Sequence, residues 1–168
     1  MTHWHDIAPT WPAIAMWGLI ASGAMATALE ASRQLGFSRM SLPFLFGTFF
    51  TMRRARAMVL GYITYLIGGW IFAFLYALVL QDFGAGSWWI GGLMGLLHGV
   101  LLVTVFLPLL PYLHPNVATH YDGPSALAKL EPPGAFGLNY GYATPATTIA
   151  AQVLFGLIFG AGYGLTLG

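Results

Sequence analysis

Four long segments of the chain are almost free of charge, and the polar residues gather between them. The segments cover residues 12–30, 57–80, 88–110 and 145–165. An α-helix rises about 1.5 Å per residue, so roughly 20 residues cross the ~30 Å hydrocarbon layer of a bilayer. The pattern therefore predicts an all-α fold, a four-helix transmembrane bundle that forms one membrane domain over residues 1–168.

The composition supports lipid as the solvent of this fold. Hydrophobic residues make up 58% of the chain and charged residues only 7%, whereas about 25% of the residues of a typical soluble domain are charged. The formal net charge of +1 also gives no support to nucleic-acid binding, which needs a strongly basic surface. The chain has no cysteine, which excludes disulfides and thiolate metal ligands.

The basic residues indicate how the helices are oriented. The connections 31–56 and 111–144 lie on one side of a four-span bundle, and they hold all six basic residues. Because cytoplasmic loops are enriched in Lys and Arg, we expect both connections in the cytoplasm and both termini on the periplasmic side of a bacterial inner membrane. Four arginines are candidates for contact with lipid phosphate: Arg39, Arg53, Arg54 and Arg56.

Two connections carry further structural expectations. Segment 31–56 mixes arginines with many apolar side chains, so we expect it in the headgroup layer, with a shallow re-entrant loop as the alternative. The connection 81–89 is short, which predicts that spans two and three are antiparallel neighbours.

Two parts of the chain resemble later parts of the same chain. Residues 43–50 and 133–140 share the pattern Pro-x-x-Phe-Gly-x-x-aromatic, ninety residues apart. Residues 69–78 and 156–165 share Gly, Ile, Phe, Tyr and Leu at matching positions, with an offset of 87. Each unit has two spans, so the copies would enter the membrane in the same direction, as a parallel 2+2 internal repeat. The predicted halves are 12–80 and 88–165.

Small residues recur at four-residue spacing on two of the predicted helices. Gly18 and Ser22 share a face of the first span, while Gly91, Gly95 and Gly99 share a face of the third. Small side chains allow two helix backbones to approach closely in lipid, so these faces are expected to pack against other helices.

His98 is the most distinctive polar residue inside a predicted span. It follows Gly95 by three residues, so we expect it on the glycine face, with Gln152 of the fourth span as a partner at similar depth. One interpretation is a neutral imidazole that hydrogen-bonds to a neighbouring helix. The alternatives are a ligand to haem iron or chlorophyll magnesium, and a group on a proton or substrate path. Under the proposed repeat, Gln152 corresponds to Tyr65 and His98 to an apolar position, so a site there would be single and asymmetric.

Three polar residues lie at the predicted membrane border. Glu30 and Arg33 are three apart on one helix and can form an ion pair, with a gate on a proton path as the alternative. Asn139 belongs to the second Pro-Phe-Gly copy, where the first copy has Phe49. If this element does more than turn the chain, the second copy is where chemistry is expected.

The candidates for metal binding and catalysis are few. His3 and His5 form a metal-capable tail, and His114, His120 and Asp122 lie in one loop. The chain has no phosphate-binding glycine loop, no nucleophile elbow and no His-Glu-x-x-His pair. The sequence therefore predicts a protein that is not an enzyme.

Three stretches, 41–50, 88–99 and 130–141, carry a resemblance to a family. They read SLPFLFGTFF, WWIGGLMGLLHG and LEPPGAFGLNYG, and they resemble a family of uncharacterised bacterial four-span integral membrane proteins. The likeness extends over about residues 18–163. It implies a bundle in the inner membrane and no catalytic residues.

These observations leave three hypotheses for function. The first is a non-catalytic accessory or scaffold subunit, packed in the bilayer against other membrane subunits or against itself, because glycine-rich faces are numerous and no catalytic groups converge. The second is a small-molecule or proton transporter that works as an oligomer, with His98, Gln152 and Glu30 on the path. The third is a subunit that binds haem or chlorophyll at His98 in an electron-transfer or light-harvesting assembly.

Overall fold

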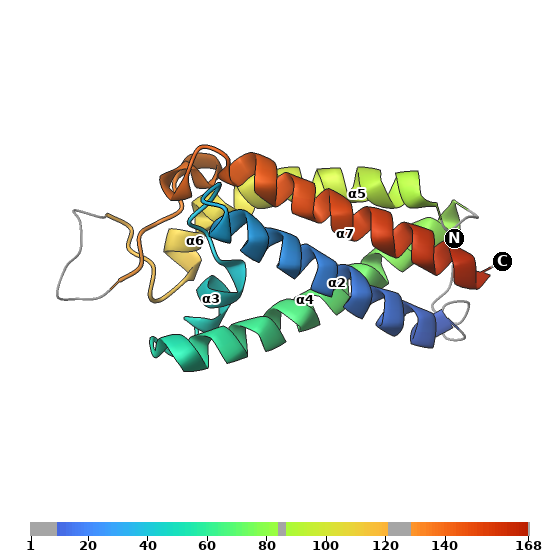
Figure 1. The fold of residues 1–168 in the computed structure, drawn as a ribbon, viewed down its shortest axis with the longest axis horizontal. Helices are drawn as coiled ribbons and strands as arrows, with labels where there is room; N and C mark the ends of the chain where they lie inside the picture. The colour runs from blue at the N-terminus through green and yellow to red at the C-terminus, as the bar shows by residue number, and fades with distance from the viewer. Residues whose placement is uncertain (1–9, 84–86, 121–128, 168) are drawn as a thin grey trace.

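The computed structural model describes residues 10–83, 87–120 and 129–167 of the chain. Four long helical segments run side by side (Figure 1), and between residues 10 and 167 the described parts contain no named strand. The segments are α2 (Trp11–Gln34), α4 (Arg54–Asp82), a continuous run of α5 (Trp88–Leu101), η2 (Leu102–Phe106) and α6 (Leu107–Leu113), and α7 (Thr144–Leu167). All four are long and apolar enough to cross a membrane. The prediction of an all-α fold with four helices long and apolar enough for an integral membrane protein is confirmed.

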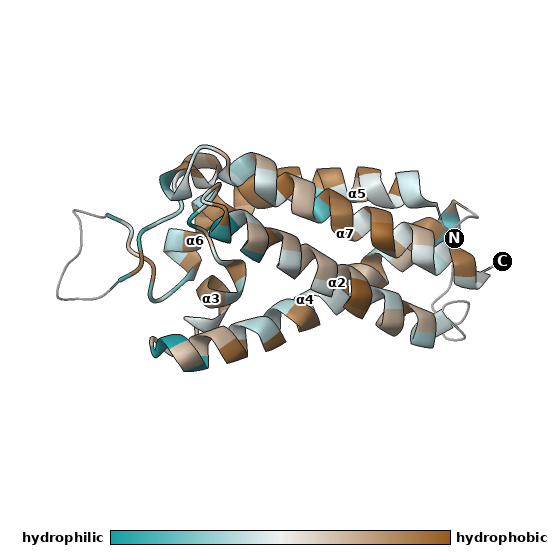
Figure 2. Cartoon of the chain, in the orientation of Figure 1, coloured by the Kyte–Doolittle hydropathy of each residue, from teal (hydrophilic) through white to brown (hydrophobic). Residues whose placement is uncertain are grey.

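The helices extend a few residues beyond the predicted spans. The helix α2 continues through Glu30 to Gln34, and α4 begins at Arg54 and ends at Asp82. Polar residues at a membrane border keep a helical backbone because their side chains can reach the headgroups. Figure 2 shows this distribution: hydrophobic colours dominate the four helices, and hydrophilic colours gather where α2 ends and α4 begins.

The most extensive contact in the fold joins α5 to α7. The backbone of Gly91 lies against the backbone of Gly156, and Gly95 lies against the backbone of Gln152. A methyl group at either glycine of α5 would collide with a carbonyl group of α7. The glycine face of α5 is therefore used inside the molecule, since only residues without a side chain allow so close an approach.

The helix α2 packs against both α4 and α7. Gly18 lies beside Ala73 and Trp70 of α4, and the Ser22 hydroxyl lies against Gly69. In contrast, α4 and α5 make few contacts although a short connection joins them. Figure 1 shows α4 diverging from α5 toward the end of the bundle that carries α3 and α6. The expectation that spans two and three pack as neighbours is wrong over most of their length. The glycine face of α5 packs against α7, and α4 packs against α2 and α3 instead of α5.

Segment 31–56 folds back onto the start of α4. Its short helix α3 (Leu42–Gly47) begins at Ser41, whose side-chain oxygen accepts a hydrogen bond from the Phe44 backbone N–H. Gly47 lies against the backbone of Ala57, and Gly61 lies against the carbonyl group of Pro43. This packing holds α3 against the first turns of α4, and the depth of the segment in the bilayer stays a prediction.

The two Pro-Phe-Gly copies have different local structures. The first forms the α-helical turn α3, whereas the second forms the 3₁₀ segment η3 (Ala135–Tyr140). In η3, Phe136 has a φ of 57° and Gly137 a φ of 76°, a conformation that costs little for glycine and more for phenylalanine. Both copies lie at the same end of the bundle (Figure 1).

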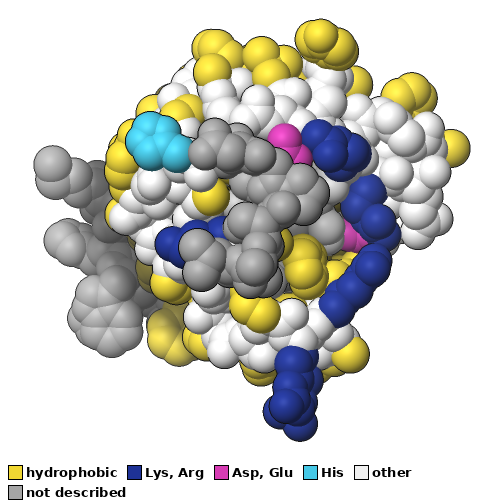
Figure 3. Space-filling view, turned by 90° about the vertical axis from the view of Figure 1, so that its left-hand side faces the viewer, with side chains coloured by type: hydrophobic (Ala, Val, Ile, Leu, Met, Phe, Trp, Pro, Cys, Tyr) yellow, Lys and Arg dark blue, Asp and Glu magenta, His cyan; other side chains and the backbone are white. Residues whose placement is uncertain are grey.

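We call this end of the bundle the arginine end, defined by Arg33, Arg39, Arg53, Arg54 and Arg56. Figure 3 views it face-on, with most of the basic side chains along the right-hand side and the lower edge of the surface. At the opposite end, the hydroxyl groups of Thr10 and Tyr163 lie 2.9 Å apart, and Gln81 Nε2 donates to Tyr163 Oη at 2.7 Å. These bonds join the start of α2, the end of α4 and the end of α7.

Candidate functional site

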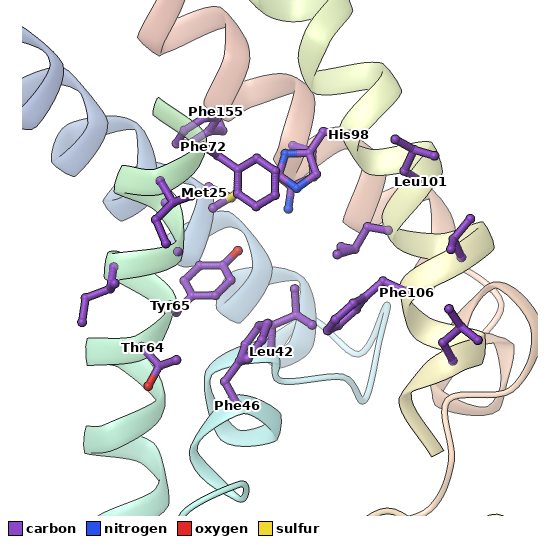
Figure 4. Close-up of a pocket in the computed structure, with 18 residues that line it drawn as sticks. Met25, Leu42, Phe46, Thr64, Tyr65, Phe72, His98, Leu101, Phe106 and Phe155 are labelled. Atoms are coloured by element: carbon purple, nitrogen blue, oxygen red, sulfur yellow. The ribbon is translucent and has the colours of Figure 1, made fainter. Parts of the chain in front are cut away.

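The divergence of α4 from α5 leaves an apolar cavity of about 630 Å³, which we call the lateral groove. One wall comes from α4 and the other from α5, η2 and α6, and α3 closes the arginine end (Figure 4). Its edges include Ile67, Ile71, Leu101 and Val105, whose side chains are about half exposed on the surface of the bundle. Because this surface belongs to spanning helices, the groove opens toward lipid rather than toward water.

A break in helical geometry shapes the second wall. Residues Leu102–Phe106 form a π-helical segment, η2, between α5 and α6. Pro108 lies two residues after this segment and has no N–H, and its ring interferes with the carbonyl group of the residue four positions earlier, Thr104. A π-helical turn absorbs this defect and is frequent at functional sites. It places Leu102, Val105 and Phe106 along the groove.

His98 lies on the groove wall and contacts α4. Its imidazole stacks on Phe72 with the ring centroids 3.8 Å apart, and its Nδ1 lies 3.3 Å from the hydroxyl oxygen of Tyr76. The expectation that His98 shares the glycine face is wrong, since that face meets α7 and His98 lies beside it. Gln152 is not its hydrogen-bond partner among the described residues, and Tyr76 takes that place.

Two buried polar atoms at the back of the groove, the Tyr65 hydroxyl and Gln152 Oε1, lack a hydrogen bond of normal geometry to any described residue. Tyr65 is 7% exposed and Gln152 is 3% exposed, and both line the groove. The Gln152 side chain lies beside the Tyr65 hydroxyl, but neither that hydroxyl nor Gln152 Oε1 completes a hydrogen bond within the described parts of the chain. A buried polar group without a partner costs roughly 1–3 kcal/mol. Such groups call for an explanation, and a missing ligand is one.

The border residues Glu30 and Arg33 form a structural link at the arginine end. Arg33 Nε donates to Glu30 Oε2 at 2.8 Å, and Ser41 Oγ donates to Glu30 Oε1 at 2.7 Å. These bonds join the last turns of α2 to the start of α3. They fit the ion-pair interpretation, and Glu30 does not line the lateral groove.

Arg39 and Asn139 meet in a second link at this end. Arg39 lies 3.3 Å from the Glu131 carboxylate and donates to the Asn139 carbonyl oxygen. The Asn139 side chain donates to the Pro132 carbonyl at 3.0 Å and so closes its own turn. Arg53, Arg54 and Arg56 are exposed and form no ion pair within residues 10–83, 87–120 and 129–167, so their contact with lipid phosphate stays a prediction.

His114 joins the end of α6 to α3. Its Nδ1 accepts a hydrogen bond from the Asn116 backbone N–H at 3.1 Å, so the ring proton is on Nε2, which donates to the Leu45 carbonyl at 3.0 Å. Burial lowers the pKa of His114 below its usual value. Both ring nitrogens are used in the fold, which leaves neither free for the metal site considered with His120.

The remaining metal candidates are not tested by the structure. His3, His5 and Asp122 lie outside the described residues. Within the described parts, no three His, Asp or Glu side chains come close enough to hold a metal ion.

Comparison with known proteins gave no match to a family model, to a curated protein or to a solved structure. The resemblance to a bacterial four-span family therefore stays a prediction, and the functional argument depends on the groove.

Sequence reasoning singled out His98 and Gln152, and the structure places both on the groove. It missed Phe72 and Tyr76 as the contacts of His98, because those contacts depend on how α4 crosses α5. Tyr65 had a signal in the sequence: it is the position that the proposed repeat matches to Gln152, and the two side chains lie side by side.

Proposed function

We propose that this integral membrane protein is a non-catalytic binding protein that holds an uncharged, bilayer-soluble small molecule in the lateral groove. The observation that carries the proposal is a pair of buried polar atoms without a hydrogen bond of normal geometry among the described residues, the Tyr65 hydroxyl and Gln152 Oε1, at the back of an apolar cavity. Binding sites for small molecules commonly combine an apolar lining with a few polar groups that fix orientation.

The lining determines the charge of the ligand. No Asp, Glu, Lys or Arg lines the lateral groove. A charged group at this depth would have no counter-charge, and placing it there would be costly. The ligand is therefore uncharged where it contacts Tyr65, His98 and Gln152.

Haem fits the groove poorly. Its two carboxylates would find no cationic side chain among the lining residues. Chlorophyll carries no such charges and stays among the uncharged candidates.

The accessory-subunit hypothesis loses one of its arguments. Most helical glycines that suggested free packing faces lie against other helices of the same chain, and Gly91, Gly95 and Gly156 are examples. Gly23 and Gly68 are exceptions, because their side-chain positions face open space. Transport remains compatible with the proposal, since a transporter must first bind its substrate.

For the setting of the protein, we propose the bacterial inner membrane with the arginine end in the cytoplasm. The support is the placement of all six basic residues in the two connections at one side. The absence of cysteine makes single-cysteine labelling a clean test. A cysteine replacing Arg54 should stay protected from an impermeant thiol reagent in intact cells, and one replacing the exposed Phe83 at the opposite end should react. The reverse pattern would overturn the orientation.

The parallel 2+2 duplication also stays a proposal, and one asymmetry bears on it. Under a two-fold relation of the halves, the contact of α2 with α7 would be matched by a contact of α5 with α4. The first contact is extensive and the second is small. The lateral groove therefore lies between α4 and α5, where a symmetric repeat would have a second extensive helix contact.

Groove binding is tested by filling the groove. Gly68 lines it, and a side chain there would meet nothing within 4 Å of its first carbon. Gly68→Leu should fold normally and exclude the ligand. Gly23→Leu is the matched control, because its side-chain position is equally open but lies outside the lateral groove.

The readout is the set of apolar molecules that copurify. Protein extracted in mild detergent is washed, treated with organic solvent and analysed by mass spectrometry. The proposal expects a compound in stoichiometric amount with the wild type and with Gly23→Leu, and its loss with Gly68→Leu. Equal recovery from the two leucine variants, or no compound from any of them, would overturn the proposal.

A further inference from the structure

The hydrogen-bonding state of His98 can be worked out from Tyr76. Tyr76 is 4% exposed, and its hydroxyl has one hydrogen-bond partner among the described residues, His98 Nδ1. If Nδ1–H donated to Tyr76, the hydroxyl hydrogen of Tyr76 would be buried without an acceptor. The arrangement that satisfies both groups has Tyr76 donating to Nδ1. The imidazole then carries its hydrogen on Nε2.

This tautomer leaves a hydrogen-bond donor at the groove. His98 Nε2 makes no hydrogen bond to any described residue, and His98 lines the cavity. Figure 4 shows the imidazole on the α5 side, and the Tyr65 ring on the α4 side with its hydroxyl directed toward the interior of the groove. Donors on two walls therefore face one space: Nε2–H of His98, and the hydroxyl of Tyr65 with the Gln152 amide beside it.

The donors lie deep in the membrane. His98 is about 15 Å along its span from Trp88, and Tyr65 is about 16 Å along α4 from Arg54, at ~1.5 Å per residue. The middle of a ~30 Å hydrocarbon layer is about this far from either border. The head of the ligand must therefore be uncharged and must accept hydrogen bonds, as a carbonyl group does.

Aromatic rings surround the same space. Phe72 stacks on His98, and the rings of Phe46 and Phe106 stack with centroids 6.0 Å apart at the end of the groove nearer α3. Flat aromatic surfaces pack well against a planar ring. The half-exposed apolar edges at Ile71 and Leu101 leave an exit to lipid for an apolar tail.

We infer that the lateral groove binds a lipid-soluble quinone, whose ring carbonyls accept hydrogen bonds from His98 Nε2 and from the Tyr65 and Gln152 pair. A quinone combines a planar uncharged ring, carbonyl acceptors and an apolar tail in one molecule. The inference rests on the proposed function, because it names the ligand class of the same groove. It assigns binding and no electron transfer.

The test compares two ligands of equal tail in protein reconstituted into lipid nanodiscs. One is a benzoquinone with a decyl chain, and the other is decylbenzene, which lacks the carbonyl oxygens. Tyr65→Phe and His98→Phe each remove one donor and keep an aromatic ring. The inference expects the quinone to bind at least tenfold more tightly than decylbenzene, and each variant to lose about tenfold of the quinone affinity alone, as one lost hydrogen bond predicts.

Infrared spectroscopy gives a readout that a purely structural role would not move. Hydrogen bonds to the ring carbonyls should lower the carbonyl stretching frequency of the bound quinone. Tyr65→Phe and His98→Phe should each shift part of that band back toward its value in lipid. Tyr65→Phe removes a hydroxyl that lacks a hydrogen bond of normal geometry in the described part of the fold, so this variant should fold and its affinity can be measured.

The outcomes separate the two proposals. If decylbenzene binds as tightly as the quinone and neither variant matters, the quinone inference is wrong while groove binding stands. If the quinone binds equally to Gly68→Leu and Gly23→Leu, it binds outside the groove, and the inference is overturned. If neither ligand binds and no compound copurifies with the wild-type protein, both proposals fail.

Discussion

The contact between α5 and α7 makes Gly91→Ala the sharpest test of the fold. A methyl group on Gly91 would lie 2.1 Å from the Gly156 carbonyl oxygen, whereas ordinary contact begins at 3.4 Å. The difference is 1.3 Å, and the obstacle is backbone, which cannot rotate away as the end of a side chain can. The two helices would have to separate by about this distance along their glycine faces.

The cost follows from the size of this separation. Forcing an extra methyl group into a packed interior costs roughly 1–3 kcal/mol. A gap of 0.5–1 Å already loses about a quarter to a half of the dispersion energy of each affected contact, so a value near the upper end is expected. Alanine is favoured over glycine within a helix by about 1 kcal/mol. The net loss in the free energy of unfolding should be about 1–2 kcal/mol.

The assay is reversible unfolding in mixed micelles with increasing dodecyl sulfate, followed by tryptophan fluorescence and circular dichroism. Gly68→Ala is the control, because its methyl group would meet nothing within 4 Å. It isolates the propensity of alanine for the helix and should raise the free energy of unfolding by up to about 1 kcal/mol. If Gly91→Ala proves as stable as Gly68→Ala, the close packing of α5 on α7 is not what holds these helices together.

Two further measurements examine single side chains. Tyr65→Phe removes a buried hydroxyl without a hydrogen bond, so the ligand-free protein should be as stable as the wild type or more stable by about 1 kcal/mol; a loss above 1 kcal/mol would mean that the hydroxyl has a structural partner. Burial lowers the pKa of His114 in the folded protein below the usual 6.5, so the unfolded chain binds the proton more readily. Its contribution to stability is complete above about pH 6.5 and is lost as the pH falls toward the folded pKa. Unfolding at pH 7.5 and pH 5 should show this loss in the wild type and a smaller one in His114→Gln, and equal losses would exclude His114 as the cause.

The sequence predicted the four spans because an uncharged apolar run of about 20 residues is typical of a transmembrane helix. The run 57–80 contains no charged residue, and no tertiary information is needed to interpret it. The helix ends were less predictable, since Gln34 and Asp82 remain helical beyond the apolar runs. The return of α3 onto α4 depends on Gly47 and Gly61 meeting backbone, and a glycine in a sequence does not say what approaches it.

The candidate site was predictable in part. A histidine and a glutamine in apolar helices are rare enough to be noticed, and both line the groove. The groove itself could not be predicted. It exists because α4 and α5 do not pack against each other over most of their length. The stacking of Phe72 on His98 and the orientation of Tyr76 follow from the same crossing, which no local pattern encodes.

The glycines of α5 connect the fold to the groove. They allow α7 to approach α5 so closely that α7 occupies the face an adjoining helix would otherwise use. The helix α4 then packs on α2 and α3, and its divergence from α5 opens the space lined by Tyr65 and His98. A change that separates α5 from α7 should therefore move the His98 wall relative to Tyr65. Gly91→Ala is expected to weaken ligand binding in the groove as well as stability, although Gly91 does not line it, and unchanged affinity in the folded variant would show that the two walls are positioned independently.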